Sequence, residues 1–382
     1  MLTLLSNTAR DYAWGSTTLL PELQGRTPSG APEAELWFGD HPGAPAFAAD
    51  GAPLGAWLAA RGAQPLPYLL KLLAAGSPLS IQAHPSKAQA EAGFVREEDA
   101  GMPRDGAHRT YRDANHKPEL IVALSAEFHA LAGLRPLPET RRLLALIGDA
   151  TAGLSSRLDG SPEATSAAIA WLLSDAATGD VRAVIGAARA AGAAQADAEF
   201  TAELALAARL DDRYPGDPGI VVALLMNLVT LRRGEGLFVA AGVLHAYLEG
   251  LGVEIMATSD NVLRGGLTPK HIDAAELVAV LDARTGPPPV VRPVAEAPGV
   301  ERYAAPVPDF ALRVARPDGA ALEVGIDGVA IILATSGSVT VAGAASGEAV
   351  TLSPGEAVLV TADERTVRVA GSGEVFLATP AS

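Results

Sequence analysis

The chain of 382 residues contains no cysteine. This absence excludes disulfide bonds, catalysis by a thiol and every metal site built on cysteine sulfur. Any metal must therefore be held by histidine, carboxylate or amide groups. Hydrophobic runs of membrane length are also missing, although hydrophobic residues make up 49% of the chain. The longest candidate, residues 220–231, is interrupted by Asn227 and falls short of the roughly 20 residues that span a bilayer, so no membrane partner is expected.

Lysine is scarce as well. Of the 29 basic residues only four are lysines, namely Lys71, Lys87, Lys117 and Lys270. In a chain that otherwise uses arginine, we expect lysine where a compact ammonium group is required. The net charge of −15 argues against nucleic acid or an anionic membrane as a partner, because binding either one needs a basic face. An anionic small molecule is compatible with this charge if basic residues are concentrated locally.

A secretory signal is the third missing feature. The first 16 residues lack a basic start, an apolar middle and a small-residue cleavage site, so we expect a cytoplasmic protein. The length of the chain, at about 100–200 residues per domain, predicts two or three domains.

The texture of the sequence changes twice along the chain. Residues 1–135 consist of short apolar runs cut by glycine and proline, which predicts strands and turns. Residues 136–233 consist of long alanine-, leucine- and arginine-rich stretches with helical spacing. In this block Ser161 is expected to cap a helix that begins at Pro162, and the last helix is expected over 217–234.

Strand texture then returns over residues 234–285. The helical block is therefore predicted to be inserted into a discontinuous β domain formed by 1–135 and 234–285. One more helix is expected to begin with Thr268 as its cap and Pro269 at its first position. After a proline-rich linker, short alternating runs separated by glycine and serine turns over 294–382 predict a third, all-β domain.

A short internal repeat connects the two predicted β domains. The segment GEGLFVAAGVLHAY, which begins at Gly234, aligns without gaps with GEAVLVTADERTVRV, which begins at Gly355. Chance and the duplication of one jelly-roll design explain so short a match equally well. In this register His245 corresponds to Thr366, so the later copy lacks the histidine.

Three short motifs carry candidate metal ligands. In SIQAHPSK, Ser80, Gln82 and His84 are spaced by two, so a strand would direct all three side chains to one face. In NHKPELIVAL, Glu119 enters an apolar strand and needs a partner, which could simply be Lys117 in an ordinary ion pair.

The third motif is AGVLHAYLEG, in which Val243, His245 and Tyr247 share one face of a strand. Any one of these histidines could instead be a residue satisfied by a single hydrogen bond. Together, two imidazoles, one carboxylate and one amide oxygen form a ligand set that suits zinc with an open position. Three strand ends would have to converge on one point, as they do in barrel-like β folds.

The fourth motif is GLGVEIMATSDNVLRGGLTPKHID. A strand carrying Glu254 runs into a polar loop with Asp260, Asn261 and Arg264. Two glycines at 265–266 would allow this loop to approach a ligand closely. The simpler interpretation is a capped entrance to a helix, since these are ordinary loop residues.

Taken together, the motifs resemble the type I mannose-6-phosphate isomerases, a family of zinc enzymes of the cupin class. The resemblance is carried by segments that keep the order of the family: YAWGS from Tyr12, AELWFGDHPGAP from Ala34, LLKLLAAGSPLSIQAHPSK from Leu69, NHKPE from Asn115, LHAY from Leu244 and VEIMATSDNVLRGGLTPK from Val253. They span the first two thirds of the chain. Ser86 departs from the family, which usually has an acid or amide there.

The resemblance implies a mainly β fold, with cupin-type jelly-roll domains and an inserted all-α helical domain. It implies one zinc ion per chain, bound by Gln82, His84, Glu119 and His245. It also implies that Arg264 is catalytic and that the pocket is lined by Lys71, Ser80, Lys117, Glu254, Asp260 and Lys270.

The activity implied is the interconversion of mannose 6-phosphate and fructose 6-phosphate through a cis-enediol, in a protein expected to be a monomer. Glu254 and Lys117 are both candidates for the base that moves the proton.

Two other functions fit parts of the pattern. A non-haem iron oxygenase needs only two histidines and one carboxylate, a triad that His84, Glu119 and His245 would supply. Gln82 and the nearby basic residues argue against it. A non-catalytic sugar-binding cupin would keep the fold and the metal without the chemistry.

Overall fold

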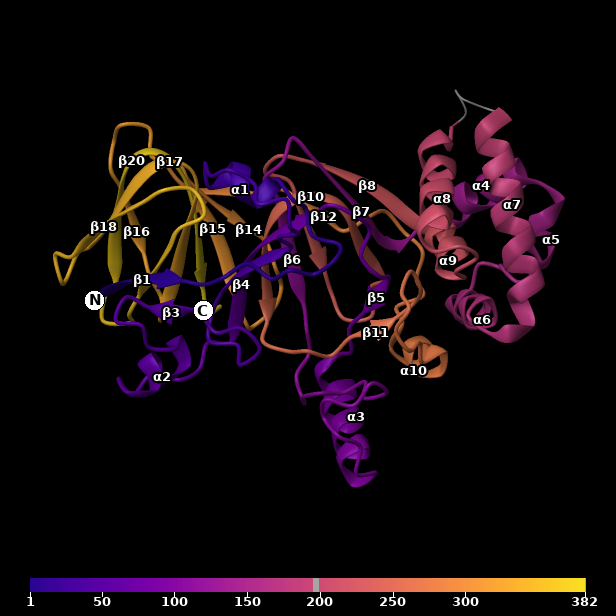
Figure 1. Ribbon diagram of the computed structural model, residues 1–382, viewed down its shortest axis with the longest axis horizontal. Helices are drawn as coiled ribbons and strands as arrows, with labels where there is room; N and C mark the ends of the chain where they lie inside the picture. Colours follow the sequence, from indigo (N-terminus) through magenta and orange to yellow (C-terminus); the bar gives the residue numbers. More distant parts are fainter. Residues whose placement is uncertain (195–198, 382) are drawn as a thin grey trace.

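In the computed structural model, which describes residues 1–194 and 199–381, the protein is mainly β. Two antiparallel sheets and a block of helices follow one another along the longest axis (Figure 1). The C-terminal sheet lies at one end, the second sheet in the middle and helices α4–α9 at the other end. Both chain termini lie at the end formed by the C-terminal sheet.

The C-terminal sheet has the strand order β13-β14-β15-β20-β17-β19-β1-β3, with β16 beside β20 and β18 beside β17. Its strands are β1 (Leu2–Ser6), β3 (Phe47–Ala48), β13 (Val294–Ala297), β14 (Val300–Tyr303), β15 (Ala311–Ala315), β16 (Leu322–Gly325), β17 (Ala330–Gly343), β18 (Ala349–Leu352), β19 (Ala357–Val360) and β20 (Thr366–Thr379). The short alternating runs after residue 294 thus form strands as the sequence predicts.

The first strand of the chain differs from the sequence-based expectation. Residues 1–135 were expected to belong together, yet β1 pairs with β19 of the C-terminal sheet, from Leu2 opposite Val360 to Leu5 opposite Ala357. Strand β3 then pairs with β1. Which sheet a strand joins depends on its tertiary contacts, and the LTLLS segment contains no local signal that identifies the sheet.

The second sheet is organised around one long strand, β10 (His245–Ala257), which pairs with β4, β5, β6 and β7. Every residue of β10 except Glu249 is buried, so this strand lies in the interior of the sheet. The other strands are β2 (Glu35–Phe38), β4 (Tyr68–Ala75), β5 (Gln82–Ala83), β6 (Glu119–Ala123), β7 (Glu127–Leu134), β8 (Met226–Arg232), β9 (Gly236–Val239), β11 (Leu263–Arg264) and β12 (Val290–Val291). This arrangement brings together three parts of the sequence that carry the candidate ligands.

The helical block lies between β7 and β8 in the chain. It contains α4 (Leu137–Ile147), α5 (Ala152–Ser155), α6 (Pro162–Leu172), α7 (Thr178–Ala194), α8 (Thr201–Arg213), α9 (Gly219–Leu225) and two short 3₁₀ turns (Asp149–Thr151 and Asp175–Ala177). The expected cap of α6 is confirmed, because Ser161 Oγ accepts a hydrogen bond from the Ala164 N–H at 3.1 Å.

The helix expected over 217–234 is wrong in its second half. Helix α9 ends at Leu225, and the next seven residues form β8 against β7. The amide of Asn227, which donates to the Ala132 carbonyl at 3.0 Å, helps to fix this strand. A continuous apolar run does not by itself distinguish a buried helix from a buried strand. Residues 226–232 form a strand because they pair with the edge of β7.

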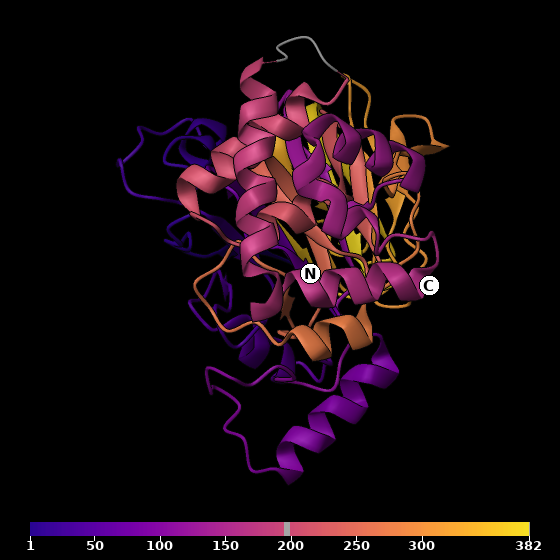
Figure 2. The ribbon, with the colours of Figure 1, turned by 90° about the vertical axis from the view of Figure 1, so that its right-hand side faces the viewer.

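In the described part of the chain, four helices lie outside the block: α1 (Leu19–Leu23), α2 (Leu54–Ala59), α3 (Lys87–Asp99) and α10 (Ala274–Val280). Helix α3 projects from the body of the molecule (Figure 2). The sequence analysis missed it, although Ser86 and Gln89 form a capping box at its start. Helix α10 begins later than predicted. Its cap is Asp273, which accepts from the Glu276 N–H at 2.9 Å, rather than Thr268.

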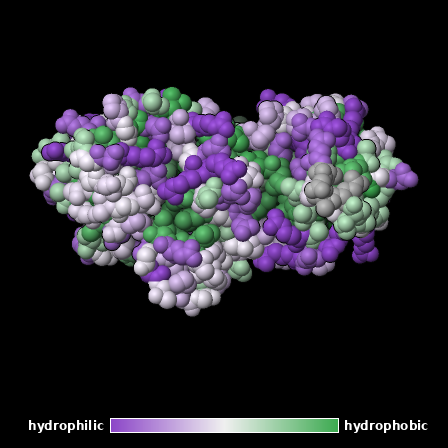
Figure 3. Space-filling view, turned by 90° about the horizontal axis from the view of Figure 1, so that it is seen from above, coloured by the Kyte–Doolittle hydropathy of each residue, from purple (hydrophilic) through white to green (hydrophobic). Residues whose placement is uncertain are grey.

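Buried tyrosines join the two sheets. The hydroxyl of Tyr68 in β4 donates to the carbonyls of Val329 and Ala378 at 3.2 and 3.0 Å, and that of Tyr303 donates to Gly234 at 2.8 Å. A single apolar cluster contains residues of both sheets. In the space-filling view, hydrophilic and hydrophobic residues are mixed over this face, and larger hydrophobic areas lie around the middle (Figure 3). None of the helices in the described ranges is long and apolar enough to cross a membrane.

The internal repeat has a structural counterpart. Strands β9 and β19 occupy the same four positions of the alignment, and His245 and Thr366 each begin the long strand that follows. The two sheets therefore use the same strand-turn-strand pattern at these positions.

Candidate active site

Three side chains from distant parts of the chain meet at one buried point. His84 follows β5, Glu119 begins β6 and His245 begins β10. Their ligand atoms all lie within 4.8 Å of one another, and each residue is at most 3% exposed. Glu119 lies between the two imidazoles, with Oε1 3.2 Å from His84 Nε2 and Oε2 3.3 Å from His245 Nε2.

Sheet pairing brings Gln82 to the same place. Gln82 in β5 lies directly opposite His245 in β10 on one side and Arg264 in β11 on the other. Its Nε2 donates to Ser80 Oγ at 3.2 Å, so the amide oxygen is the end that presents lone pairs. Gln82, Glu119 and His245 line one pocket. The structure thus brings together all four residues that the sequence singled out as ligands.

The hydrogen bonds around the imidazoles determine what this cluster can hold. His84 Nδ1 bonds the carbonyl of Asn261 at 2.7 Å, and a carbonyl only accepts, so Nδ1 carries the proton. Nε2 of the neutral ring then bears a lone pair directed toward a carboxylate. Within the described residues this buried Nε2 has no hydrogen-bond partner. His245 Nδ1 lies 3.1 Å from the Val243 carbonyl in a similar arrangement.

Electrostatics keep His84 Nε2 and Glu119 unprotonated. Burial, with a further contribution from Lys117, lowers the pKa of His84 to about 4. Burial would raise the pKa of Glu119, but Lys117 and His84 outweigh it and hold the pKa well below its usual range. The ligand atoms of the two imidazoles and the carboxylate converge on one point, an arrangement that fits a divalent cation.

A second set of charges lines the same pocket. Lys71 Nζ is 3.0 Å from Glu254 Oε2 and 3.4 Å from Glu35 Oε1, and all three groups are buried. Burial alone would lower the pKa of Lys71, but Glu254 and Glu35 reverse the effect and raise it. Burial raises the pKa of Glu254 despite Lys71. The result is a permanently charged lysine beside a carboxylate that takes up a proton more readily than usual.

The pocket itself is small and polar. It encloses about 70 Å³ of free space, room for a few water molecules. Its lining comprises Glu35, Lys71, Leu73, Leu79, Ser80, Gln82, Lys117, Glu119, His245, Ala246, Tyr247 and Glu254. Lys117 Nζ contacts Glu119 Oε1 at 2.8 Å, so the ion pair considered as the simple alternative is present together with the histidine cluster. Space of this size suits the reacting end of a small molecule, whose remainder must extend toward the rim.

Three further predicted residues lie outside this inner pocket, at its rim. Arg264 occupies the two-residue strand β11, and Asp260 and Lys270 lie on the loops before and after it. His41 holds Asp260 at 3.3 Å and, by this hydrogen bond, lowers its pKa. Burial and the nearby Arg112 lower the pKa of Arg264. The structure therefore separates the predicted residues into an inner group and a rim group.

The sequence analysis missed several residues of the site. Glu35, like Glu119, is a carboxylate within an apolar segment that forms a fully buried strand. The same pattern could therefore have identified it in the sequence. Tyr247 was placed on the face of His245 but was given no role, and its hydroxyl lies 3.4 Å from Glu119 Oε2. Asn261 was named in the polar loop but was given no role; it is fully buried and bonds both His84 and the loop around Asp113.

The glycines at 265–266 serve packing rather than ligand approach. Gly266 has a φ of 123°, and a Cβ there would lie 2.3 Å from the Gly219 Cα at the start of α9. Gly265 faces Ile81 and Leu277. The loop does approach another group closely, as the two glycines predicted, but that group is the start of helix α9 rather than a ligand.

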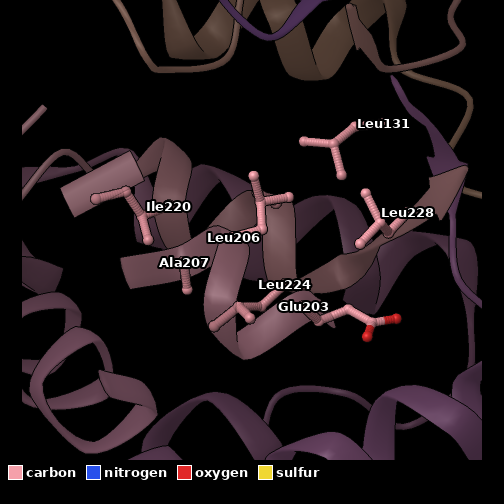
Figure 4. A pocket seen from close by; sticks show the side chains of 8 residues that line it. Leu131, Glu203, Leu206, Ala207, Ile220, Leu224 and Leu228 are labelled. Atoms are coloured by element: carbon pink, nitrogen blue, oxygen red, sulfur yellow. The ribbon is translucent and has the colours of Figure 1, made fainter. Parts of the chain in front are cut away.

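A different pocket lies beside the helical block (Figure 4). It is an apolar crevice with no room for a water molecule, lined by Leu131, Leu206, Ala207, Ile220, Ala223, Leu224, Leu228 and Glu203. Its lining is almost entirely apolar and cannot bind a polar substrate, so we interpret it as a packing gap between α8, α9 and β8.

Comparisons with known proteins show which proteins the chain is similar to. The family description "Phosphomannose isomerase type I, catalytic domain" matches residues 2–137. The mannose-6-phosphate isomerase of Escherichia coli K12 is 36% identical, with 97% of both chains covered, and that of Homo sapiens is 31% identical, with 94% of this chain and 93% of the human protein covered. A solved mannose 6-phosphate isomerase with zinc bound superposes over 100% of both chains with a TM-score of 0.89 and 33% identity.

Proposed function

The chain belongs to the mannose-6-phosphate isomerase family, and we propose that it interconverts mannose 6-phosphate and fructose 6-phosphate as a zinc enzyme. The observation that carries the proposal is the buried cluster of His84, Glu119 and His245, whose lone pairs converge beside a pocket of charged side chains. The relatives are similar over nearly their whole length, which supports the same activity here.

We assign one zinc ion per chain to Gln82, His84, Glu119 and His245. The unpartnered Nε2 of His84 and the oriented amide of Gln82 support this ligand set. When bound there, zinc supplies Lewis-acid stabilisation of negative charge on the substrate oxygens, an effect of several kcal/mol. The carbonyl of Asn261 orients His84, and the Val243 carbonyl orients His245, as expected of groups behind metal ligands.

Isomerisation moves a proton between carbons 1 and 2 through a cis-enediol, and the chain must provide a base. We assign that role to Glu254. Its carboxylate is buried in the inner pocket, and its raised pKa suits a group that both takes up and returns a proton near neutral pH. Lys71, held at 3.0 Å, keeps this carboxylate oriented.

Lys117 is the weaker candidate for the base. Its ammonium lies 2.8 Å from Glu119 Oε1, so removing its proton would cost a buried ion pair at the metal cluster. We propose instead that Lys117 binds substrate and stabilises the ionised Glu119. Ser80, beside Gln82, supplies a hydroxyl to the sugar.

Arg264 is proposed to stabilise the negative charge that develops on the enediol. It is half-buried on the strand next to Gln82 and forms no ion pair within residues 1–194 and 199–381. We expect Arg264→Ala to lower kcat by about 100-fold while zinc content stays stoichiometric, because it removes a charge-assisted contact made in the transition state. Steady-state kinetics and metal analysis by emission spectroscopy test this.

The control is Arg292→Ala, since Arg292 is exposed and pairs with Glu235 on the surface. It should leave kcat unchanged. Near-normal turnover of Arg264→Ala would show that Arg264 is not catalytic.

The finer architecture is also a proposal. We propose that the two sheets are cupin-type jelly rolls, with catalytic segments 1–135 and 234–285, a helical insert over 136–233 and a C-terminal β domain over 294–382. Helices α4–α9 between β7 and β8 and the matching positions of β9 and β19 support this division. Because β1 pairs within the C-terminal sheet, the segment 1–135 contributes strands to both sheets. We further propose that the protein is a cytoplasmic monomer.

Activity of the purified protein is the direct test. Incubated with mannose 6-phosphate and zinc under anaerobic conditions, it should produce fructose 6-phosphate until equilibrium. Treatment with a chelator should abolish conversion, and added zinc should restore it. Loss of activity without oxygen would point to the oxygenase alternative, and zinc binding without any conversion would point to a sugar-binding cupin.

A further inference from the structure

One stretch of the pocket wall has no regular secondary structure of its own. Residues 115–118 lie outside every helix and strand, directly before β6, and Lys117 is among them. Lys117 Nζ lines the inner pocket and contacts Glu119 Oε1 at 2.8 Å. Backbone outside helices and strands takes its position from the groups that hold it. The place of the Lys117 ammonium therefore depends on contacts made by its neighbours.

The two ends of this segment are held from within the second sheet. The side chain of Asn115 donates to the Thr258 carbonyl at 3.0 Å, and the Asn115 carbonyl accepts from Asn261 Nδ2 at 2.8 Å. At the other end, the Pro118 carbonyl accepts from the Ala257 N–H at 3.1 Å. These bonds all come from the end of β10 and the loop after it. The residues between the two ends are left to other contacts.

His116 connects the segment to the other sheet. Its Nε2 lies 2.7 Å from Asp309 Oδ2, and the two residues are 193 positions apart in the chain. A carboxylate oxygen only accepts, so Nε2 donates the hydrogen bond. The two side chains are mostly buried, 19% and 12% exposed, which shields the bond from solvent. A shielded bond to a carboxylate is stronger than an exposed surface pair.

The backbone around Asp309 is anchored in the core. Asp309 lies on the loop between β14 and β15, and the next residue, Phe310, is 1% exposed. Phe310 belongs to the apolar cluster that contains residues of both sheets. Because close-packed side chains leave little room for movement, the Asp309 carboxylate offers His116 a fixed point.

The directions of two neighbouring side chains explain why this bond affects Lys117. Lys117 precedes Pro118, and a residue before proline is restricted to extended conformations. Successive side chains of an extended chain point to opposite sides. Holding His116 toward the C-terminal sheet therefore turns Lys117 toward the pocket, where its ammonium meets Glu119.

We infer, on the basis of the proposed function, that Asp309 is a positioning residue, which holds His116 and so keeps Lys117 in the pocket. Asp309 acts only through this contact, because it is not among the residues that line the pocket. The C-terminal domain thus has a role in the reaction, although no described residue of that domain lines the pocket.

Asp309→Asn keeps the shape of the side chain and removes its charge. We expect it to lower kcat/KM for mannose 6-phosphate by about 10-fold, the loss of one charge-assisted hydrogen bond. Zinc content should stay stoichiometric. Asp309→Glu restores the charge on a longer side chain and should recover part of the loss. Steady-state kinetics and metal analysis by emission spectroscopy are the measurements.

A double-mutant cycle with Lys117→Met distinguishes positioning from general stabilisation. If Asp309 acts through Lys117, Asp309→Asn should lower kcat/KM by less than about twofold in the Lys117→Met background, because the effects of coupled groups do not add. A loss by the same factor in both backgrounds would overturn the inference, since a change in overall stability does not depend on Lys117.

Arg233→Gln is the matched control. Arg233 joins the same two sheets through Glu374 at 3.0 Å, and neither residue is among those that line the pocket. Its replacement removes an ion pair between the sheets without touching residues 115–118, so kcat/KM should be unchanged. An equal loss in this variant would show that any loosened contact between the sheets lowers activity, which contradicts a specific role of Asp309.

Hydrogen exchange, followed by mass spectrometry, tests the anchor without any turnover. In Asp309→Asn the amides of residues 113–119 should exchange about 10-fold faster while β4 and β10 keep their protection. Arg233→Gln should leave residues 113–119 unchanged. Local acceleration in a protein without isomerase activity would refute the proposed function and support the anchor. An active enzyme in which Asp309→Asn changes neither exchange nor kcat/KM would overturn the inference and leave the function intact.

Discussion

His245→Ala is expected to leave the protein without stoichiometric zinc and to lower turnover by more than about 100-fold. Replacing a group that only supports a metal ligand commonly lowers metal affinity or activity by about 10- to 100-fold. Because His245 is proposed as a ligand itself, a larger loss is expected. Its Nε2 lies 3.3 Å from Glu119 Oε2, and its ring packs 4.9 Å from that of His84. Gln82→Ala should act in the same direction. Zinc content by emission spectroscopy and steady-state turnover are the measurements.

His129→Ala is the control for His245→Ala. His129 lies on the neighbouring strand β7, and its Nδ1 bonds the hydroxyl of Thr230 on β8 at 3.1 Å. Its replacement removes an imidazole from the same sheet without touching the pocket, so zinc and turnover should be unchanged. Stoichiometric zinc in a folded His245→Ala protein would refute the ligand assignment.

Glu254→Gln should lower kcat by about 100- to 10,000-fold, the usual contribution of a general base, while the bound zinc is kept. The amide has nearly the shape of the carboxylate but cannot accept the proton from carbon 1 or 2. Glu254 is 2% exposed and bonds Lys71 at 3.0 Å, so the variant also changes the local charge. Circular dichroism and zinc analysis should show that fold and metal survive.

The pH profile gives a second measure of Glu254. A base works only in its deprotonated form, so the rate falls as pH drops through its pKa. Burial raises the pKa of Glu254, which shifts this acid limb to higher pH than that of an ordinary glutamate. Residual activity of Glu254→Gln should lack that limb.

Glu249→Gln is the matched control, since Glu249 lies on the same strand with its side chain 62% exposed. It should retain both rate and pH profile. Should Glu254→Gln remain active while Lys117→Met loses turnover with zinc retained, the base would be Lys117.

Much of the metal cluster could be predicted from the sequence. The alternation of side chains in a strand put Ser80, Gln82 and His84 on one face, and the absence of cysteine left histidine, carboxylate and amide as the ligands. The order of the motifs was enough to indicate the family. The start of α6 was equally clear, because a serine cap followed by proline is a local signal.

Other features depend on contacts between distant residues. Residues 226–232 form β8 rather than the end of a helix because β7 offers an edge to pair with, and β1 joins the C-terminal sheet for the same kind of reason. The segment expected to open helix α10 is instead held by Asp217, which accepts from the Leu267 N–H at 3.0 Å, and the helix begins later, after its cap Asp273. No local pattern encodes these partners.

The sequence by itself determined which side chains can hold a metal and which family the chain resembles, because ligand chemistry and strand periodicity are properties of neighbouring residues. Only the tertiary structure decided how the charges are distributed. Antiparallel pairing around β10 places Lys71 opposite Glu254 and close to Glu35, and so neutralises Lys71. A charge acts through its distance to other charges, and those distances are fixed only when the chain has folded.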